Sequence, residues 1–406
     1  MAPAIHQVLA TLGYGDAIGH EVLGIQRVLR NAGYESEIFV QTAEPRVEDL
    51  TVHYSHLRDA SHPDNILIHH FSIGSRASRL AYALPDRMVL IYHTITPPQY
   101  FVDINKELVR LCFRGRRELA LYQSRCDLAL GDSEYNRQEL DALGFSPTGV
   151  LPVVPGFDHL SMSDSRTADG FADEWVNVLF VGRVIPNKRF EDLIRAFHAY
   201  KTFFNPRSRL LLVGSHSGFE RYVAMLHGLI ARLGVRDVHL VGHVSNEELT
   251  AYYEVADVFV SASEHEGFCV PLIESFHMGV PVIAYAATAV PSTMDGAGIL
   301  YTNKDPMHLA ALINAVIEDP ALADRIVDGQ NAALARLTAQ DFGGTLLHHI
   351  NGVLASPRKP HPDIAFDFWD QVEAAEEYDE LKEHRPAAYQ AMPPEPGTGI
   401  RESGTE

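Results

Sequence analysis

The sequence predicts an α/β protein in which two doubly wound parallel sheets follow one another along the chain. Its 406 residues exceed what one α/β core usually holds. Short apolar runs alternate with longer helical patterns, which is typical of β-α-β units. The composition, with 46% hydrophobic and 21% charged residues, is that of a globular protein and excludes collagen-like, coiled-coil and wholly disordered chains.

The first sheet is expected to begin with a strand at residues 5–12, followed by a helix from Ala17 to Asn31. Apolar residues recur at helical spacing in that segment, and Gly33 follows it as a helix-ending glycine. Further strands of this sheet are expected at residues 36–41, 65–71, 87–93, 127–132 and 149–154.

A polar stretch rich in Ser, Asp and Gly then interrupts the alternation. After it, strands of a second sheet are expected at residues 175–183, 209–215, 237–243, 257–263 and 280–286. We therefore expect a first domain at residues 1–155, a linker at 156–173, a second domain at 174–337, C-terminal helices at 338–390 that could pack back on the first domain, and a disordered tail at 391–406.

Net charge and cysteine content narrow the class of protein. The chain carries 33 Lys and Arg against 53 Asp and Glu, a formal charge of −20, which argues against general binding of nucleic acid. Its three cysteines, Cys112, Cys126 and Cys269, form no C-x-x-C pair, so neither a disulfide framework nor a zinc ribbon is indicated. The N-terminus lacks the pattern of a secretory signal and no apolar run is long enough to span a membrane, so we expect a cytoplasmic protein.

The most informative stretch lies between residues 261 and 284. A strand is expected to end near Ala262, and Pro271 stands where the first residue of a helix would, which makes the start of this helix an anion site at the ligand-binding edge of the sheet. Glu266 precedes the helix and Glu274 lies about one turn inside it. From these positions the two carboxylates can accept hydrogen bonds from sugar hydroxyls on either side of a diphosphate that rests on the helix start. Alternatively, Glu274 is a favourable first-turn acid and Glu266 a surface charge.

A second stretch places two cations at the same edge. Gly182 and Arg183 end a strand, and Lys188 follows five residues later near the start of a helix. A diphosphate leaving group that is not held by a metal needs such a clamp. The alternative is a pair of surface cations that cap a loop.

Together these two stretches closely resemble the donor-binding half of the retaining nucleotide-sugar glycosyltransferases of family 4, also called group 1. The E-x7-E pattern of that family appears as EGFCVPLIE, and its phosphate clamp as VGR-xxxx-K. VGS at residues 213–215 and VGHVSNEEL at 241–249 lie between them, and the resemblance extends over nearly all of residues 173–337. It implies the GT-B fold, two tandem Rossmann-like domains facing a central cleft.

The resemblance also implies roles for individual residues on the donor side. Arg183 and Lys188 would hold the diphosphate, with Gly182 in the same turn, and Glu274 would bond the ribose. Glu266 and the backbone of Gly267, Phe268 and Cys269 would contact the donor sugar. The amides near Val270 and Leu272 would contact the phosphate. The loop around His243, Val244 and Asn246 would contact the nucleobase.

The first half resembles the family less closely. Gly13 and Gly15 form a turn after the first strand that would line the other wall of the cleft, although such a turn is more often structural. Gly15 would lie on the donor side of this wall, and Gly13 and Asp16 on the acceptor side. By resemblance His93, at the end of its strand, would touch the donor sugar; a packing role is the alternative. His69 and His70 are weaker candidates, and Ser133 is expected to cap a helix.

Residues 106–125 are basic in an otherwise acidic protein. Lys106, Arg110, Arg114 and Arg117 fall on one helical stripe, with apolar residues on the opposite side. The segment is either a helix with a solvated basic face or a docking surface for anionic lipid or a phosphorylated acceptor.

From these observations and the resemblance we expect a metal-independent, retaining glycosyltransferase. It would move a hexose from a UDP- or GDP-linked donor to a hydroxyl of a polysaccharide, glycolipid or small molecule, and it would use no cofactor. The alternatives are a phosphorylase or epimerase of the same fold, and a catalytically idle scaffold that binds sugar nucleotides.

Overall fold

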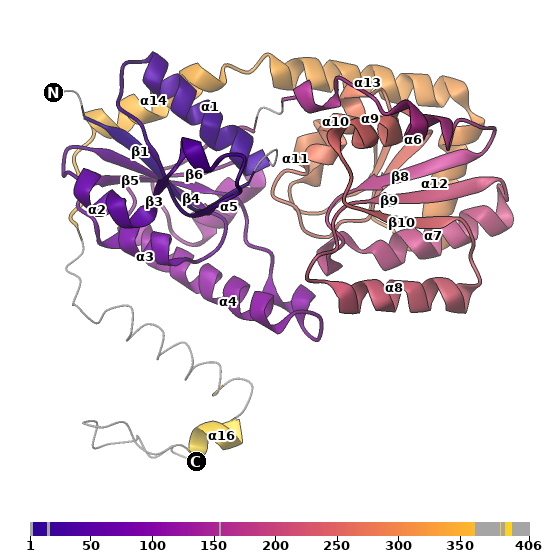
Figure 1. The fold of residues 1–406 in the computed structure, drawn as a ribbon, viewed down its shortest axis with the longest axis horizontal. Helices are drawn as coiled ribbons and strands as arrows, with labels where there is room; N and C mark the ends of the chain where they lie inside the picture. Colours follow the sequence, from indigo (N-terminus) through magenta and orange to yellow (C-terminus); the bar gives the residue numbers. More distant parts are fainter. Residues whose placement is uncertain (1–2, 14–16, 154–155, 362–381, 383–385, 392–406) are drawn as a thin grey trace. The chain divides into compact units, whose positions relative to one another are not determined.

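Two parallel sheets form the framework of the protein (Figure 1). The structure is a computed structural model that describes residues 3–13, 17–153, 156–361, 382 and 386–391. The first sheet has seven strands in the order β3-β2-β1-β4-β5-β6-β7. Its strands are β1 (Ile5–Leu12), β2 (Ile38–Ala43), β3 (Val52–His53), β4 (Ile66–Phe71), β5 (Arg87–Tyr92), β6 (Leu128–Gly131) and β7 (Thr148–Val150).

The second sheet has six parallel strands in the order β10-β9-β8-β11-β12-β13. Its strands are β8 (Val176–Val181), β9 (Ser208–Val213), β10 (Val238–Gly242), β11 (Val258–Ser261), β12 (Val282–Tyr285) and β13 (Ile299–Tyr301). In each sheet the order reverses beside the first strand of that half, β1 or β8, and open α/β sheets bind ligands at the carboxyl ends of strands at such a point. The predicted α/β class with two tandem doubly wound sheets is confirmed.

Helices connect the strands of both sheets, as parallel pairing requires. Those of the first half are α1 (Ala17–Asn31), α2 (Leu57–Ala60), α3 (Arg76–Ala83), α4 (Lys106–Leu121) and α5 (Glu134–Ala142). Those that follow are α6 (Ser165–Asp169), α7 (Phe190–Phe203), α8 (Glu220–Leu233), α9 (Asn246–Glu254), α10 (Val270–His277), α11 (Val290–Met294), α12 (Pro306–Glu318), α13 (Pro320–Thr338), α14 (Phe342–Ala355) and α16 (Pro386–Gln390).

The core of the first sheet includes a helix from the far end of the sequence. Leu346, Ile350 and Val353 of α14 are buried in one cluster with Ile25 and Leu29 of α1 and with apolar side chains of β1, β4, β5 and β6. Figure 1 shows α1 and α14 together on one side of this sheet and α3 and α4 on the other. Burial of this kind, at about 25 cal/mol per Å² of apolar surface, is the main force that holds α14 there.

The segment expected as a linker contains short helical turns. Residues Asp158–Leu160 form a 3-10 helix, and α6 follows at Ser165–Asp169 with Asp164 as its N-cap. The Asp164 amide donates to the carbonyl of Glu247 in α9 at 2.9 Å, which ties this segment to the second sheet's helices. The segment that contains His159 is thus attached to α9 by a backbone hydrogen bond.

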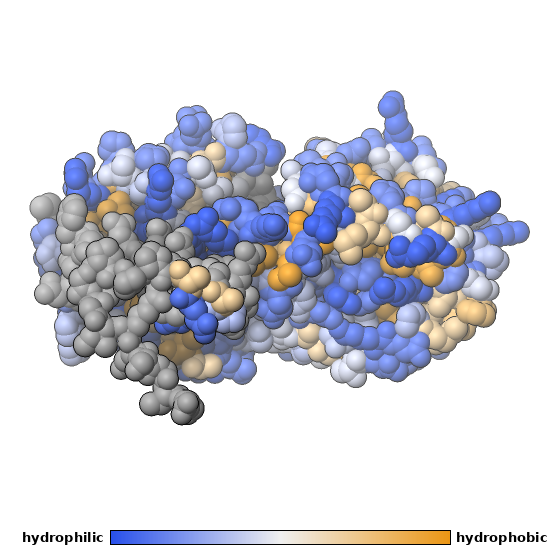
Figure 2. Space-filling view, turned by 90° about the horizontal axis from the view of Figure 1, so that it is seen from below, coloured by the Kyte–Doolittle hydropathy of each residue, from blue (hydrophilic) through white to orange (hydrophobic). Residues whose placement is uncertain are grey.

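Residues 1–360 and 361–406 form separate units, and the described part of the second contains α16. Figure 2 shows one face of the protein, which carries mostly hydrophilic side chains with small apolar patches between them. Among the described residues, no helix has both the length and the apolar character that a membrane crossing requires.

Candidate active site

The start of α10 lies at the carboxyl end of β11, as the position of Pro271 predicted. Cys269 precedes the helix in a left-handed conformation, with φ 76°, and Gly279, with φ 70°, follows its end. Pro271 has no N–H, and the Leu272 amide donates to the Cys269 carbonyl at 3.1 Å. A phosphate at the position expected for it would therefore share the Leu272 amide with the Cys269 carbonyl. The sequence did not indicate this bond within the protein.

Lys188 and Glu266 form an ion pair beside this helix start. Asn187 joins the two segments, because its carbonyl accepts from the Glu264 amide at 2.8 Å and its side chain donates to the His265 carbonyl at 3.0 Å. Both charged side chains are largely buried, with 15% of Lys188 and 7% of Glu266 exposed. The two predicted stretches thus meet at one place.

The charge of Lys188 is secured by its partner. Burial lowers the pKa of Lys188, but the charge and hydrogen bond of Glu266, together with the Cys269 thiol, act in the opposite direction, and the net result is a pKa above the ordinary value. A buried lysine that stays protonated can stabilise negative charge that develops on a leaving phosphate.

Gly182 and Arg183 form the turn that follows β8. The Gly182 amide donates to the Val213 carbonyl at 2.9 Å, and Gly214 packs directly against the Gly182 backbone. Arg183 is exposed, and its guanidinium carbon lies 5.7 Å from the ring centroid of Phe219. Arg183 therefore lies at the surface of the site, in the same turn as Gly182.

Glu274 is held by two protein groups. The hydroxyl of Tyr253 donates to its Oε2 at 2.7 Å, and Nε2 of His159 lies 2.9 Å from its Oε1. Burial, reinforced by the Glu274 charge, raises the pKa of Tyr253 far above its usual value, so the tyrosine remains a donor. The sequence did not single out His159 or Tyr253, and no local pattern pointed to either.

His93 ends β5 inside a buried polar cluster rather than at an open surface. Its Nε2 lies 3.0 Å from Nδ1 of His70, and its Nδ1 lies 3.4 Å from Asp132 Oδ2 and 3.7 Å from Glu21 Oε2. Burial raises the pKa of Glu21 to about 7. Both ring nitrogens of His93 face protein groups, an arrangement that favours the packing alternative for the ring.

Gly267 brings the donor-side loop against the His93 segment. A Cβ on Gly267 would lie 3.0 Å from Thr94 Oγ1 and 3.2 Å from the His93 carbonyl oxygen. A side chain at position 267 would therefore be crowded, and the backbone of His93 and Thr94 lies beside the Glu266 loop.

The other predicted site residues are distributed as follows. His243 is exposed and Val244 half-buried in the turn between β10 and α9, and Gly13 is half-buried just after β1. Phe268 and Val270 are half-buried, and burial raises the pKa of the Cys269 thiol well above its usual range. Gly15 and Asp16 lie outside the described residues.

Two further predictions from the first half can be compared with the structure. Ser133 caps α5, because its Oγ accepts from the Asn136 amide at 3.2 Å, which confirms the capping role. In α4, Lys106 and Arg110 are exposed, whereas Arg114 and Arg117 are half-buried, so the basic stripe is less solvated than its spacing suggested. Arg117 is partly covered because it lies over the Phe113 ring at 5.8 Å.

Comparison with known proteins relates part of the chain to a family. Residues 163–332 match the family model described as Glycosyl transferases group 1. A D-inositol 3-phosphate glycosyltransferase of Thermobifida fusca is 32% identical over 226 residues, covering 52% of this chain and 52% of the relative. An O-antigen chain mannosyltransferase B of Escherichia coli is 31% identical over 181 residues, covering 44% of this chain and 43% of the relative. The chain thus spans about half the length of the curated relatives it matches.

Solved structures share the architecture across most of the chain. Sucrose-phosphate synthase from Thermosynechococcus elongatus superposes with a TM-score of 0.67 at 18% identity, covering 87% of this chain and 100% of that one. Anabaena HepE in complex with UDP and glucose gives 0.64 at 19% identity with the same coverage of 87% and 100%. Residues 163–332 therefore resemble the group 1 glycosyltransferases of family 4, and the two parallel sheets have the GT-B architecture.

Proposed function

We propose that this protein is a retaining glycosyltransferase that moves a hexose from a nucleoside-diphosphate sugar to an acceptor hydroxyl without a metal ion. The observation that carries the proposal is the meeting of Lys188 and Glu266 beside the start of α10. A cation and a carboxylate at one helix start suit the diphosphate and the hydroxyls of one sugar nucleotide. In this proposal the first domain, residues 1–155, binds the acceptor and the second, residues 174–337, binds the donor.

The proposed reaction exchanges one bond at the anomeric carbon. The bond from that carbon to the phosphate oxygen breaks, and the acceptor oxygen forms a new bond on the same face of the sugar. The departing phosphate oxygen takes the acceptor proton, while Lys188 and Arg183 stabilise the growing negative charge. Glu266 orients the sugar by accepting from its hydroxyls, and Glu274 does the same for the ribose. Retention itself comes from the family resemblance.

The relatives support a choice of donors and acceptors to test first. The Anabaena structures hold UDP, UDP-glucose, or UDP with glucose, and the curated relatives are named for an inositol phosphate and for an O-antigen chain. We therefore place UDP-sugars before GDP-sugars, and we propose a polyol or a glycan hydroxyl as the acceptor.

Turnover of nucleotide sugars tests this function. The full chain is incubated with UDP- and GDP-hexoses and a panel of hydroxyl acceptors, and release of free nucleoside diphosphate and the anomeric form of the product are measured. We expect release with one donor and a product with the anomeric configuration of that donor. A product with the opposite anomeric configuration would refute retention. Sugar transfer that continues at the same rate without any nucleotide would favour a phosphorylase.

We also propose that helix α4 contacts the surface of an anionic membrane. Its exposed Lys106 and Arg110 would contact anionic headgroups, at about 1 kcal/mol for each basic side chain near such a surface. We expect the protein to sediment with vesicles that contain phosphatidylglycerol but not with neutral vesicles, and to lose this binding in a Lys106→Glu, Arg110→Glu variant. Sedimentation that is independent of lipid charge would refute the contact.

A further inference from the structure

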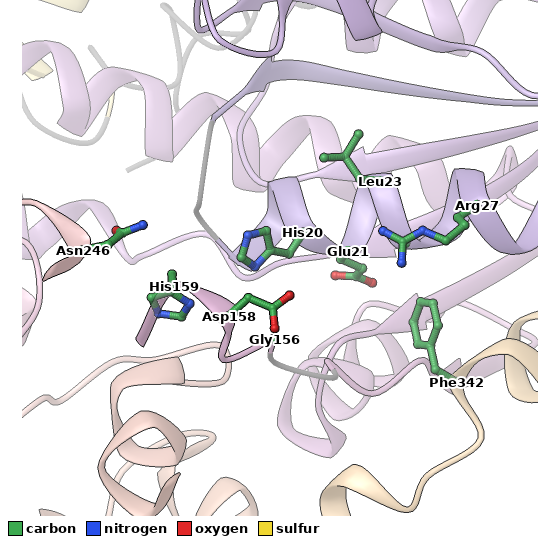
Figure 3. A pocket seen from close by; sticks show the side chains of 10 residues that line it. His20, Glu21, Leu23, Arg27, Gly156, Asp158, His159, Asn246 and Phe342 are labelled. Carbon is green, nitrogen blue, oxygen red and sulfur yellow. The ribbon is translucent and has the colours of Figure 1, made fainter. Parts of the chain in front are cut away.

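A buried polar cluster joins helix α1 to the carboxyl ends of three strands of the first sheet. Its members are Glu21 of α1, His70 of β4, and His93 and Asp132, which directly follow β5 and β6. All four residues are buried. Glu21 also lines a pocket of about 530 Å³ along α1 (Figure 3). The proposed transfer reaction uses none of the charges of this cluster.

The direction of each hydrogen bond in the cluster follows from its outer end. Gln7 Nε2 donates to the Val22 carbonyl at 3.0 Å, so Gln7 Oε1, which only accepts, faces His70 Nε2 at 2.9 Å. Nε2 of His70 therefore carries a hydrogen. Burial holds the pKa of His70 well below its usual value, so the ring is neutral and its Nδ1 is an acceptor. His93 accordingly donates to that atom through Nε2, at 3.0 Å.

The other nitrogen of His93 faces two carboxyl groups, Asp132 at 3.4 Å and Glu21 at 3.7 Å. A lone pair on this nitrogen would be repelled by both, so Nδ1 also carries a proton and His93 pairs with Asp132. Burial raises the pKa of Asp132, and hydrogen bonds from His93 and Asn136 act against burial. Neither carboxyl oxygen of Glu21 has a hydrogen-bond partner among the described residues. Glu21 is therefore the group that keeps its proton near neutral pH.

Other titratable groups face Glu21 from several elements. Burial raises the pKa of Glu21 to about 7, and among the charges His93 acts against burial and Asp132 with it. His69 of β4 stays neutral, because burial lowers its pKa to about 3. The walls of the pocket add His20, Arg27, Asp158 and His159. The first three are exposed, so solvent screens them, and Nε2 of His159 faces Glu274. The proton on Glu21 is thus controlled mainly from inside the cluster.

A series of contacts leads from the cluster to the donor loop. Asn136 donates through Nδ2 to Asp132, and its Oδ1 accepts from the Thr94 hydroxyl. Thr94 has φ 67°, a left-handed conformation that is rare for a β-branched residue. A Cβ on Gly267 would lie 3.0 Å from Thr94 Oγ1. The groups that hold Thr94 therefore also limit where the Gly267 loop can lie.

We propose that Glu21 and Asp132 are positioning residues for the donor sugar, and that the proton on Glu21 keeps the Thr94 turn in place against the Gly267 loop. The proposal rests on the proposed function, in which the backbone of Gly267 contacts that sugar. Loss of the proton leaves two buried negative charges beside one imidazolium. Their repulsion displaces Asp132, and with it Asn136 and Thr94, so the sugar binds more weakly.

Initial-rate kinetics of the full chain at about pH 6 and about pH 8 test the proposal. The donor is the UDP- or GDP-hexose that the protein turns over, varied at saturating acceptor. A group with a pKa of about 7 is roughly 90% protonated at the lower pH and roughly 10% at the higher, so the donor KM of the wild type should rise about 10-fold. Glu21→Gln cannot ionise, and its KM should stay near the lower wild-type value at both pH values.

Binding of UDP or GDP alone separates this inference from the proposed function. At each pH the wild type and Glu21→Gln should have the same Kd in calorimetric titration, because Lys188 and Arg183 hold the diphosphate in the proposed function. Glu35→Gln, which changes an exposed carboxylate in the same way, should keep the pH dependence of the wild-type KM.

The wild-type measurement does not depend on the folding of any variant. A wild-type KM that is equal at the two pH values would overturn this inference alone. The same holds for a Glu21→Gln KM that rises as that of the wild type does. Turnover of no donor, together with no binding of either nucleotide, would overturn the proposed function and this inference with it.

Discussion

Lys188 and Glu266 bring opposite charges to a part of the protein where both side chains are largely buried. Removal of one partner leaves the other charge buried without compensation, which is usually more damaging than loss of the pair itself. In the proposed reaction the lysine has the additional task of stabilising a leaving phosphate. Substitution of single residues therefore tests the proposed transfer reaction most sharply.

Replacement of Lys188 by alanine tests the leaving-group role. We expect kcat to fall by about 10² to 10³, because loss of one preorganised charge donor commonly has that effect. The measurement is initial-rate kinetics with the donor varied at saturating acceptor. Arg207→Ala, which removes an exposed cation that pairs with Glu174, is the control and should leave kcat unchanged. A Lys188→Ala enzyme with the parental kcat would contradict the role.

The buried carboxyl of Glu21 should make the free energy of unfolding depend on pH. Burial raises the pKa of its carboxyl from 4.5 to about 7, the Asp132 charge acts in the same direction, and His93 acts against it. The folded protein therefore keeps a proton that the unfolded chain has already released between these values, so this contribution is fully present below pH 4.5 and is lost as pH rises through about 7.

Glu21→Gln removes this dependence. The difference in free energy of unfolding, variant minus wild type, should be larger at pH 8 than at pH 5, which are about the two ends of that window. The reason is that only the wild type must bury an ionised carboxylate at about pH 8. Urea unfolding at both pH values measures the difference, with the exposed Glu35→Gln as a control. An unchanged difference between variant and wild type at the two pH values would show that Glu21 ionises normally.

At the scale of elements, the sequence predicted the limits of α10 better than the contacts of its residues. Pro271 and Gly279 correctly marked the limits of α10, since both residues restrict backbone conformation locally. The pairing of His159 with Glu274, by contrast, joins residues 115 positions apart, and the position of His159 depends on how its turn packs on α9. No local pattern contains that information.

The turn with Gly182 and Arg183 depends on a neighbouring glycine. Gly214 has φ 150°, and a Cβ there would lie 2.0 Å from the Gly182 carbonyl oxygen, a backbone atom that cannot rotate away. Gly214→Ala should therefore displace the Gly182 turn, lower the free energy of unfolding by about 1–3 kcal/mol and weaken nucleotide binding.

Urea unfolding and titration with UDP measure both effects. Gly228→Ala is the matched control, because its Cβ would meet only the Arg232 side chain at 3.6 Å, and a helical Gly-to-Ala change stabilises by up to about 1 kcal/mol. A Gly214→Ala variant with wild-type stability and affinity would show that the turn tolerates the extra atom.

At the scale of the whole molecule, the predicted two-sheet α/β organisation is confirmed because β-α-β alternation is a property of the chain as a sequence of local patterns. The cluster of Glu21, His70, His93 and Asp132 is different, since it forms only when β1, β4, β5 and β6 lie side by side in that order. His93 and His70 were named from their strand ends, but Glu21 and Asp132 were not. The order of strands, rather than any motif, brings them together.

Thermal unfolding with nucleoside diphosphates tests whether Arg183, Lys188 and the start of α10 form one diphosphate site. UDP or GDP at 100 times its Kd should stabilise the wild type by about 2.7 kcal/mol. The Arg183→Ala, Lys188→Ala double variant should gain little or no stability from the same ligand. Equal stabilisation of both proteins, or no stabilisation of the wild type by either nucleotide, would show that these residues do not form a diphosphate site.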